Sequence, residues 1–327
     1  MAGNIMKQFN CVLSALLIIC SCACSTASQE KADTARPAPD EGTISITTNT
    51  ENGRVQITLK RTSTLPDTFT DRLASLSSHP WELQCMHCSL DRADLEVFRP
   101  WRSNIQSLTV ENPHSFGPDI LDAISSSHLE ELYIRFIRIE DVSFLASFPQ
   151  LKRLAIVGTR IQDDSMAHII GLGNLNWLSL GKNHRLTGSA LQALAASPAA
   201  KELRVLRIWE TGIRGPDLVH LEHFPGLQKL AIAKLVLQHG QLEPLLFLQS
   251  LTHLDLGNCR IANEDLEILA ALPALKNLNL SFCTLDDSAL SVLGTLQTLH
   301  ELFLFEAGIS DGAKNRLRGM LPNCRVY

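Results

Sequence analysis

A near-constant stride of leucines runs through the last two thirds of this chain. Eight short leucine-led segments, which we call heads, recur along it, and five of the seven intervals between them are equal, as from Leu227 to Leu251. The heads begin at Leu129, Leu151, Leu175, Leu203, Leu227, Leu251, Leu275 and Leu299. A fixed period of roughly 20–29 residues is typical of a solenoid, in which similar units stack and the core grows by adding turns. The 327-residue chain is long for one compact core, and a solenoid avoids that limit.

Each head alternates apolar and variable residues. In one of them Leu254 and Leu256 follow Leu251, an alternation typical of a strand with one buried face. Cys259 and Ile261 then begin a second buried row in the same unit. Leucines at helical spacing come next, namely Leu266, Leu269 and Leu272. Each unit is therefore predicted to form a strand, a turn and a short helix, and stacking buries the faces that no unit can bury alone.

The pattern resembles that of the leucine-rich repeat superfamily. It is nearest to the subtypes with repeats of roughly 24–26 residues and Cys or Thr after the strand. The motif Leu254-x-Leu256-x-x-Cys259-x-Ile261 carries the resemblance, which covers about residues 105–327. It implies an α/β horseshoe with a parallel sheet on the concave side and short helices on the convex side. It also implies a scaffold for binding rather than catalysis.

Two units depart from the common length. The Leu129 unit spans only residues 129–150 and is shorter than the others, whereas the Leu175 unit spans residues 175–202 and is longer. The longer unit contains Asn183 just after its strand and residues 197–200 near its end. We therefore expect a bulge on the helix side of the Leu175 unit.

Residues 43–104 are predicted to cap the first repeat, because a bare solenoid end leaves an open sheet edge over an open core. Alternating apolar runs flank Asn52-Gly53, a pattern that favours a β-hairpin over residues 43–61. A short helix is expected near residues 66–77. The hairpin and the helix would together close this end of the solenoid.

Irregular copies of the head mark both ends of the repeat array. Trp81, Leu83 and Cys85 alternate as a first, degenerate strand, and a weaker head at Ile105 begins the repeats of residues 105–327. A last head begins at Leu321 and stops after Val326, Tyr327 being the final residue. Val326 is expected to close the final layer of the core.

Residues 1–21 have the layout of a secretory signal. Lys7 precedes an apolar run over residues 12–19 that is too short to span a bilayer. The sequence Ile19-Cys20-Ser21-Cys22 resembles a bacterial lipobox, which implies cleavage before Cys22 and lipid on its thiol. Export is thus predicted, with membrane anchoring through Cys22.

Three features leave the form of export open. Cys24 is an alternative lipid site, although Ser21 stands where a lipobox has an aliphatic residue. Ordinary cleavage after Ala27 would instead release a soluble secreted or periplasmic protein. Ala23 after the lipidated cysteine favours the outer membrane if the organism is Gram-negative. Residues 22–42 are predicted to carry the lipid and to form a disordered tether. Its residues 25–42 are rich in Ser, Ala, Pro and charge and would reach about 25 Å from the anchor.

The cysteines of the folded region have more than one interpretation. Cys259 and Cys283 occupy the same position in adjacent repeats, where a small buried side chain is expected. Cys85 and Cys88 form a Cys-Met-His-Cys motif that would make a local disulfide in an exported chain. A redox or metal module built on Cys85 and Cys88 is the alternative, although no thioredoxin-like context or second ligand pair accompanies them.

Acidic residues cluster where each predicted helix begins. They are Asp141, Asp163, Asp164, Asp286, Asp287 and Asp311. An aspartate there satisfies free backbone N–H groups and meets the positive end of the helix dipole, so capping is predicted rather than catalysis. His220 and His223 have metal-ligand spacing but no third ligand, and no nucleophile or phosphate-loop motif occurs. The sequence therefore predicts no enzyme activity, metal or cofactor.

The residues two, four and six positions after each head leucine should line the concave sheet. Among them lies a set of aromatic and arginine side chains, the types that dominate binding hot spots. The set is Tyr133, Arg135, Arg153, Trp177, Arg207 and Trp209. We predict that it binds a protein partner; the alternative is that a loop of the long unit covers the aromatic rings.

The function predicted from these features is protein recognition at the bacterial cell envelope by a tethered, non-catalytic module. A net charge of −5 and a pI near 6.1 argue against a nucleic-acid partner. The alternatives are a structural envelope protein without a specific partner and the Cys85–Cys88 redox or metal module.

Overall fold

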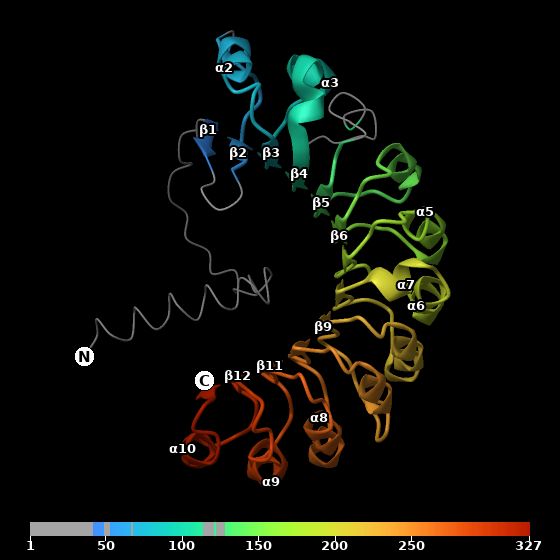
Figure 1. The fold of residues 1–327 in the computed structure, drawn as a ribbon, viewed down its shortest axis with the longest axis vertical. Coiled ribbons are helices and arrows are strands. Elements are labelled where there is room, and N and C mark those ends of the chain that lie inside the picture. The colour runs from blue at the N-terminus through green and yellow to red at the C-terminus, as the bar shows by residue number, and fades with distance from the viewer. Residues whose placement is uncertain (1–41, 49–52, 67, 114–120, 122–127) are drawn as a thin grey trace, which may run out of the picture. The chain divides into compact units, whose positions relative to one another are not determined.

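The structure, a computed structural model, describes residues 42–48, 53–66, 68–113, 121 and 128–327. The predicted signal segment, Cys22 and Cys24, and the tether as far as residue 41 lie outside these ranges. The described strands form one 13-stranded sheet in which spatial order follows sequence order. Strands line the inner side of the curved array and helices line its outer side, as Figure 1 shows. The predicted α/β leucine-rich repeat solenoid is confirmed.

The first end of the array is a hairpin followed by a helix, as predicted. Strands β1 (Thr43–Thr48) and β2 (Val55–Lys60) pair antiparallel, and Gly53 between them has a φ of 68°. Helix α2 (Phe69–Ser75) buries Phe69 and Leu73. From β2 onward every neighbouring pair of strands is parallel.

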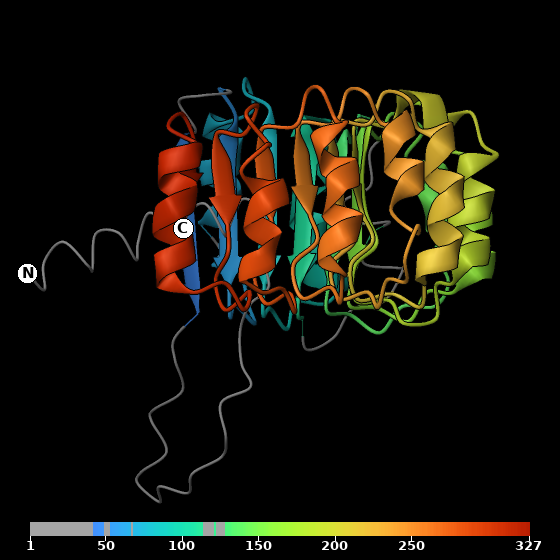
Figure 2. The same ribbon diagram turned by 90° about the horizontal axis from the view of Figure 1, so that it is seen from below.

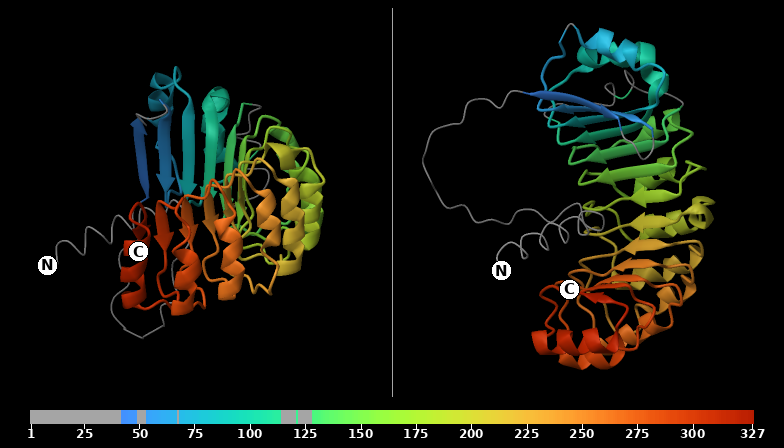
Figure 3. Two further views of the ribbon diagram at one scale, coloured as in Figure 1. Left: turned by 60° about the horizontal axis from the view of Figure 1, so that its bottom comes forward. Right: turned by 60° about the vertical axis from the view of Figure 1, so that its left-hand side comes forward.

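The strands of the repeats stack in parallel, one for each head. Figure 3 shows them side by side, with β1 outermost at one end. Their bounds are β3 (Trp81–Met86), β4 (Ile105–Glu111), β5 (Glu131–Arg135), β6 (Arg153–Val157), β7 (Trp177–Ser179), β8 (Val205–Arg207), β9 (Lys229–Ala231), β10 (His253–Asp255), β11 (Asn277–Asn279), β12 (Glu301–Phe303) and β13 (Arg325–Val326). Val326 is buried beneath the last layer, as expected.

Figure 2 shows the outer layer as a row of helical coils. These segments are a mixture of α-helix and 3-10 helix rather than one α-helix per repeat. The α-helices are α3 (Arg92–Leu95), α5 (Met166–Ile169), α6 (Gly188–Ala195), α7 (Ala199–Glu202), α8 (Glu267–Ala270), α9 (Leu290–Leu293) and α10 (Asp311–Met320). The 3-10 segments are η1 (Glu96–Asn104), η2 (Ser143–Ser147), η3 (Asp163–Ser165), η4 (Gly215–His223), η5 (Glu243–Phe247), η6 (Asn263–Leu266) and η7 (Asp287–Ala289). The bulge expected in the Leu175 unit corresponds to a second helix, α7, which follows α6 after residues 196–198.

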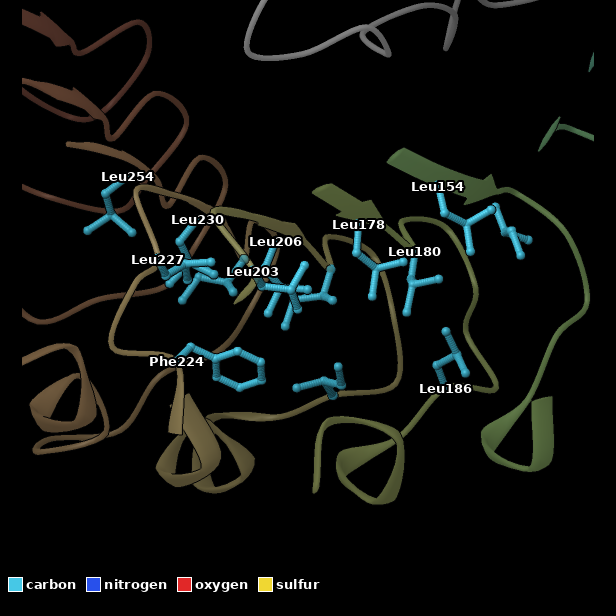
Figure 4. Close-up of a cluster of buried hydrophobic side chains, with 14 of the residues drawn as sticks. Leu154, Leu178, Leu180, Leu186, Leu203, Leu206, Phe224, Leu227, Leu230 and Leu254 are labelled. Atoms are coloured by element: carbon cyan, nitrogen blue, oxygen red, sulfur yellow. The ribbon is translucent and has the colours of Figure 1, made fainter. Parts of the chain in front are cut away.

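Stacked leucines make one continuous core between the sheet and the outer layer. In Figure 4 the corresponding strand leucines of successive repeats lie in a row. They are Leu154, Leu178, Leu206, Leu230 and Leu254, each at most 2% exposed. Phe224 and Leu186 line the helix side of the same core. The core therefore extends along the whole array, and each unit is stabilised by its two neighbours.

In each repeat, a residue with left-handed backbone conformation follows the strand. The residue seven places after each head leucine has a φ between 45° and 67°, whether or not it is glycine. The set in the repeats is Asn112, Phe136, Gly158, Lys182, Glu210, Lys234, Asn258, Phe282 and Glu306. Left-handed backbone costs about 1–2 kcal/mol for a residue with a Cβ. Hydrogen bonds between neighbouring repeats offset this cost, because such residues donate their backbone N–H to the following repeat. The N–H of Lys182, for example, donates to the carbonyl oxygen of Trp209 (2.9 Å).

In several units the residue after this left-handed position is buried and donates a hydrogen bond to the preceding turn. Asn183 is 1% exposed, and its Nδ2 donates to the carbonyl oxygens of Ile156 (2.7 Å) and Leu180 (3.0 Å). Its Oδ1 accepts from both the backbone N–H and the hydroxyl of Thr159. In the equivalent place Cys283 donates its Sγ–H to Leu256 O (3.2 Å), so the repeat cysteines are buried as predicted.

Four of the six aspartates predicted to cap helices accept bonds from backbone N–H groups, namely Asp141, Asp163, Asp286 and Asp287. At the start of α10 the cap is Ser310 rather than Asp311. Asp286 caps η7 by accepting from Ser288 N (2.8 Å), and Asp141 accepts from Ser143 N (2.8 Å). These bonds lower the pKa of both carboxyls. Asp163 and Asp287 instead accept from the residue that begins the helix of the following repeat. Capping thus extends into links between units.

A candidate binding site on the concave face

Four of the six predicted binding residues form one cluster on the concave face. Tyr133 and Arg135 belong to β5, Arg153 to β6, and Trp177 to β7. Sheet register places Tyr133 opposite Ala155 and Arg153 opposite Trp177. We call Tyr133, Arg135, Arg153 and Trp177 the aromatic–arginine cluster.

Two aromatic rings meet across the strand that separates them. The rings of Tyr133 and Trp177 lie edge to face, with centroids 5.8 Å apart. Ala155 of the intervening strand is only 1% exposed and carries too small a side chain to separate the rings. An edge-to-face pair of this kind contributes roughly 0.5–1.5 kcal/mol beyond its buried area. The two rings are therefore pre-organised.

The arginines of the cluster face the tyrosine. The Arg135 guanidinium carbon lies 5.7 Å from the centre of the Tyr133 ring, within cation–π range. Burial and the charge of Glu131 raise the pKa of Tyr133 to about 12, while a hydrogen bond with Arg153 acts in the opposite direction. The Tyr133 hydroxyl consequently stays protonated and donates to Glu131 Oε2 (3.2 Å).

Glu131 anchors the cluster to the cap. Besides the tyrosine hydroxyl, its carboxylate accepts from Arg54 Nη1 (3.0 Å) and Ser107 Oγ (3.2 Å). Arg135 also lies 3.6 Å from a carboxylate oxygen of Glu111. These bonds hold the tyrosine end of the cluster, so a ligand would meet a fixed surface.

Trp209 lies apart from the cluster. It follows β8 by two residues and is only 9% exposed, so it offers far less surface than the half-buried Trp177. Trp177 lies opposite Val205 of β8. Trp209 comes four residues after Val205, which places it roughly 13 Å farther along the strand direction than Trp177. Trp209, although one of the six predicted binding residues, therefore lies outside the aromatic–arginine cluster.

A second group surrounds Trp209 instead. Lys182 Nζ lies 5.4 Å from the centre of the Trp209 ring and 5.5 Å from that of Phe136. A Cβ on Gly181 would collide with the Trp209 ring, and one on Gly158 would come within 2.7 Å of Phe136, so each ring lies directly over a glycine. Sequence reasoning missed Phe136 and Lys182, because both occupy the left-handed position rather than the alternating strand positions.

Arg207 lies on β8, opposite Ser179 and Ala231. Asp255 lies opposite Ala231 on the next strand, β10. Burial raises the pKa of the Asp255 carboxyl, and the positive charge of Arg207 acts in the opposite direction. Asp255 is held by Gly257 N (2.9 Å) and Asn279 Nδ2 (2.8 Å). Arg207 therefore belongs to a polar group farther along the sheet.

The middle concave positions are less open than strand alternation predicts. Four residues after the head leucine, most side chains are buried although they point away from the core. They include Ala155, Ser179, Ala231, Asp255, Asn279 and Phe303. Short strands on a curved sheet bring neighbouring concave side chains together, so larger residues cover smaller ones.

Cys85 and Cys88 are free thiols in the structure, which differs from the predicted disulfide. Cys88 follows the left-handed His87 (φ 55°) and donates its Sγ–H to Leu59 O (3.1 Å), as Cys283 does to Leu256. A hydrogen bond from Cys85 lowers the pKa of Cys88 to about 7, while the pKa of Cys85 is raised. Cys88 thus occupies an ordinary repeat position.

The described residues contain no group of three or more His, Cys, Asp or Glu side chains placed to hold a metal ion. In the same ranges, no helix has the length and apolarity needed to cross a bilayer.

Comparison with known proteins supports the repeat architecture. A sequence model described as "Leucine Rich repeat" matches residues 247–270, and no curated protein matches the chain. An internalin from Listeria monocytogenes is similar over 82% of this chain and 85% of its own, with 18% identity and a TM-score of 0.51. Internalin C2 of the same organism is similar over 67% of this chain and 83% of its own, with 23% identity and a TM-score of 0.48. The repeated heads and the stacked parallel strands give this chain the fold of a leucine-rich repeat solenoid, and a leucine-rich repeat model matches a segment within it.

Proposed function

We propose that this protein is an exported, non-catalytic recognition module that binds a protein partner through its concave face. The observation that carries the proposal is the aromatic–arginine cluster. Its Tyr133–Trp177 pair is rigid, partly exposed and flanked by Arg135 and Arg153. Such surfaces concentrate binding energy, because the apolar rings are already ordered and the cations select the partner.

The chemistry of the cluster indicates the kind of surface that it fits. An aromatic pair offers a flat apolar platform, and guanidinium groups bind carboxylates through paired hydrogen bonds. A partner that presents an apolar side chain beside Asp or Glu would match both features. A nucleic acid fits less well, because the chain carries a net charge of −5.

Replacing Trp177 with alanine is expected to weaken partner binding by at least tenfold, as for a hot-spot aromatic residue. The partner would be captured from envelope extracts with the full chain, identified by mass spectrometry and titrated against each variant. Thermal unfolding of Trp177→Ala should shift down by only a few degrees, because the lost contact with Tyr133 contributes roughly 0.5–1.5 kcal/mol.

Phe247→Ala is the matched control, because Phe247 is a 57% exposed aromatic residue of η5 on the convex side. It should bind the partner as the wild type does. Unchanged binding by Trp177→Ala, or an equal loss in Phe247→Ala, would remove the concave-face proposal. Capture of no protein by the wild type would favour the structural alternative without a specific partner.

Anchoring through Cys22 is part of the proposal and rests on the lipobox-like sequence alone. Cys22→Ser is expected to move the protein from the membrane fraction to the soluble fraction, since no acyl chain can then be attached. Cys24→Ser is the control and should stay with the membrane. Cell fractionation and immunoblotting measure both; membrane association of Cys22→Ser equal to wild type contradicts the anchor.

A redox role for Cys85 and Cys88 is less well supported. Both thiols are at most 5% exposed, whereas reactive cysteines lie in partly exposed sites. Cys88 donates a hydrogen bond to Leu59 O, as the repeat cysteines Cys259 and Cys283 do to the preceding turn, which is a structural role.

A further inference from the structure

The two ends of the sheet are finished in different ways. At the last strand, Arg318 of α10 donates from Nε (3.2 Å) and Nη2 (2.9 Å) to Val326 O. Tyr327 stacks on Phe303 with ring centroids 4.8 Å apart. The final edge is thus covered by a helix, a guanidinium group and an aromatic ring.

The first edge has none of these protections among the described residues. Strand β1 is outermost (Figure 3), and β2 is the only described strand with which it pairs. Its sequence, Thr-Ile-Ser-Ile-Thr-Thr, contains no charged residue and no proline. Proteins normally guard a free edge with lysine, proline or a bulge, because its unpaired N–H and C=O groups accept another strand.

The sequence of β1 is self-complementary. Residues 43–47 read Thr-Ile-Ser-Ile-Thr in both directions, with Ser45 at the centre. If two such strands pair antiparallel about a two-fold axis at Ser45, Ile44 faces Ile46 and Thr43 faces Thr47 in both halves. A two-fold interface requires a surface that matches itself, and this strand does so residue by residue.

The core beneath β1 is also unfinished. Ile44 and Ile46 pair with Leu59 and Ile57 of β2 and pack against the core. The β2 side chains are fully buried, whereas both β1 isoleucines remain partly exposed. A second copy would bring its own Ile44 and Ile46 against them and remove this apolar surface from water.

We propose that two copies of this chain associate through β1, which pairs antiparallel with β1 of the second copy. The pairing joins the two sheets edge to edge, and its two-fold axis is perpendicular to the sheet. Both concave faces then lie on the same side of the joined sheet. The dimer would present two aromatic–arginine clusters to one partner surface, which raises avidity without any new contact.

The central position of β1 provides a direct test. Ser45 is exposed and lies opposite Thr58 of β2, so a charged side chain there points to solvent within one copy. In the dimer, Ser45 faces Ser45, so Ser45→Lys or Ser45→Asp sets like charges against each other. Light scattering after size exclusion is expected to give a dimer for the full-length wild-type chain and a monomer for each variant.

Mixing the two variants should restore the dimer, because the introduced lysine of one copy then faces the introduced aspartate of the other. Thr48→Lys is the matched control: it adds the same charge to β1, but two such lysines would lie about 20 Å apart along the strands. It should remain dimeric. A monomeric wild type, a dimeric Ser45→Lys, or a mixture that stays monomeric would each overturn the proposal.

Discussion

Replacing Phe224 with alanine is expected to lower the free energy of unfolding by about 3–5 kcal/mol. The ring is fully buried at the end of η4, on the helix side of the core in Figure 4. Alanine would remove its apolar contacts and leave a cavity that the rigid strands and turns cannot close. Urea unfolding monitored by circular dichroism measures the change.

The repeats supply a matched control for this substitution. Three residues before their head leucines, Leu248, Leu272 and Leu296 occupy the place of Phe224 and are buried. Phe224→Leu should therefore cost less than about 1.5 kcal/mol. Hydrogen exchange should rise chiefly in the Leu203 and Leu227 units, because each repeat is stabilised by its neighbours. A loss below about 1 kcal/mol for Phe224→Ala would contradict the tight packing described.

Replacing Asn183 with alanine is expected to cost about 3 kcal/mol, although the side chain is polar. Its amide bonds Ile156 O, Leu180 O and Thr159 N, all within 3.0 Å, and only 1% of its surface is exposed. Alanine would leave these backbone groups without partners, and each buried unsatisfied group costs about 1–3 kcal/mol. The same urea titration gives the difference from wild type.

Asn183→Cys is the corresponding control. Cysteine occupies the equivalent position at Cys259 and Cys283, where the thiol donates to the preceding strand, and Cys259 also accepts a backbone N–H. Asn183→Cys should therefore retain part of the bonding and lose roughly half as much stability as Asn183→Ala. Equal losses for the two variants would mean that side-chain volume, not hydrogen bonding, matters at this position.

The sequence predicted the fold because its signal was repeated. A single Leu-x-x-Leu-x-Leu segment fits many structures, but eight at a near-constant stride fit few. The hairpin at Asn52-Gly53 and the helix beginning near Phe69 followed from local turn chemistry and apolar spacing. The mixture of 3-10 and α-helical turns did not, since segments this short gain their geometry from the stacking of neighbouring units.

The candidate site was predicted only in part. Strand alternation placed Tyr133 and Trp177 on the concave face, but not their contact across Ala155, which depends on sheet register. It also treated Trp209 as the equal of Trp177. The left-handed turn after the strand, visible in sequence only at Gly158, brings Lys182 against the Trp209 ring.

The sequence by itself determined the repeat, the position of the strand in each unit and the identity of the core, because these depend on periodicity within one unit. Only the tertiary structure decided which side chains meet between units. Cys88 shows the difference. The sequence Cys85-Met86-His87-Cys88 suggests a dithiol motif, whereas in the stacked units Cys88 occupies the position equivalent to Cys283 and donates a hydrogen bond to Leu59 O. Contacts between repeats depend on register and curvature, and neither is encoded in the residues of a single unit.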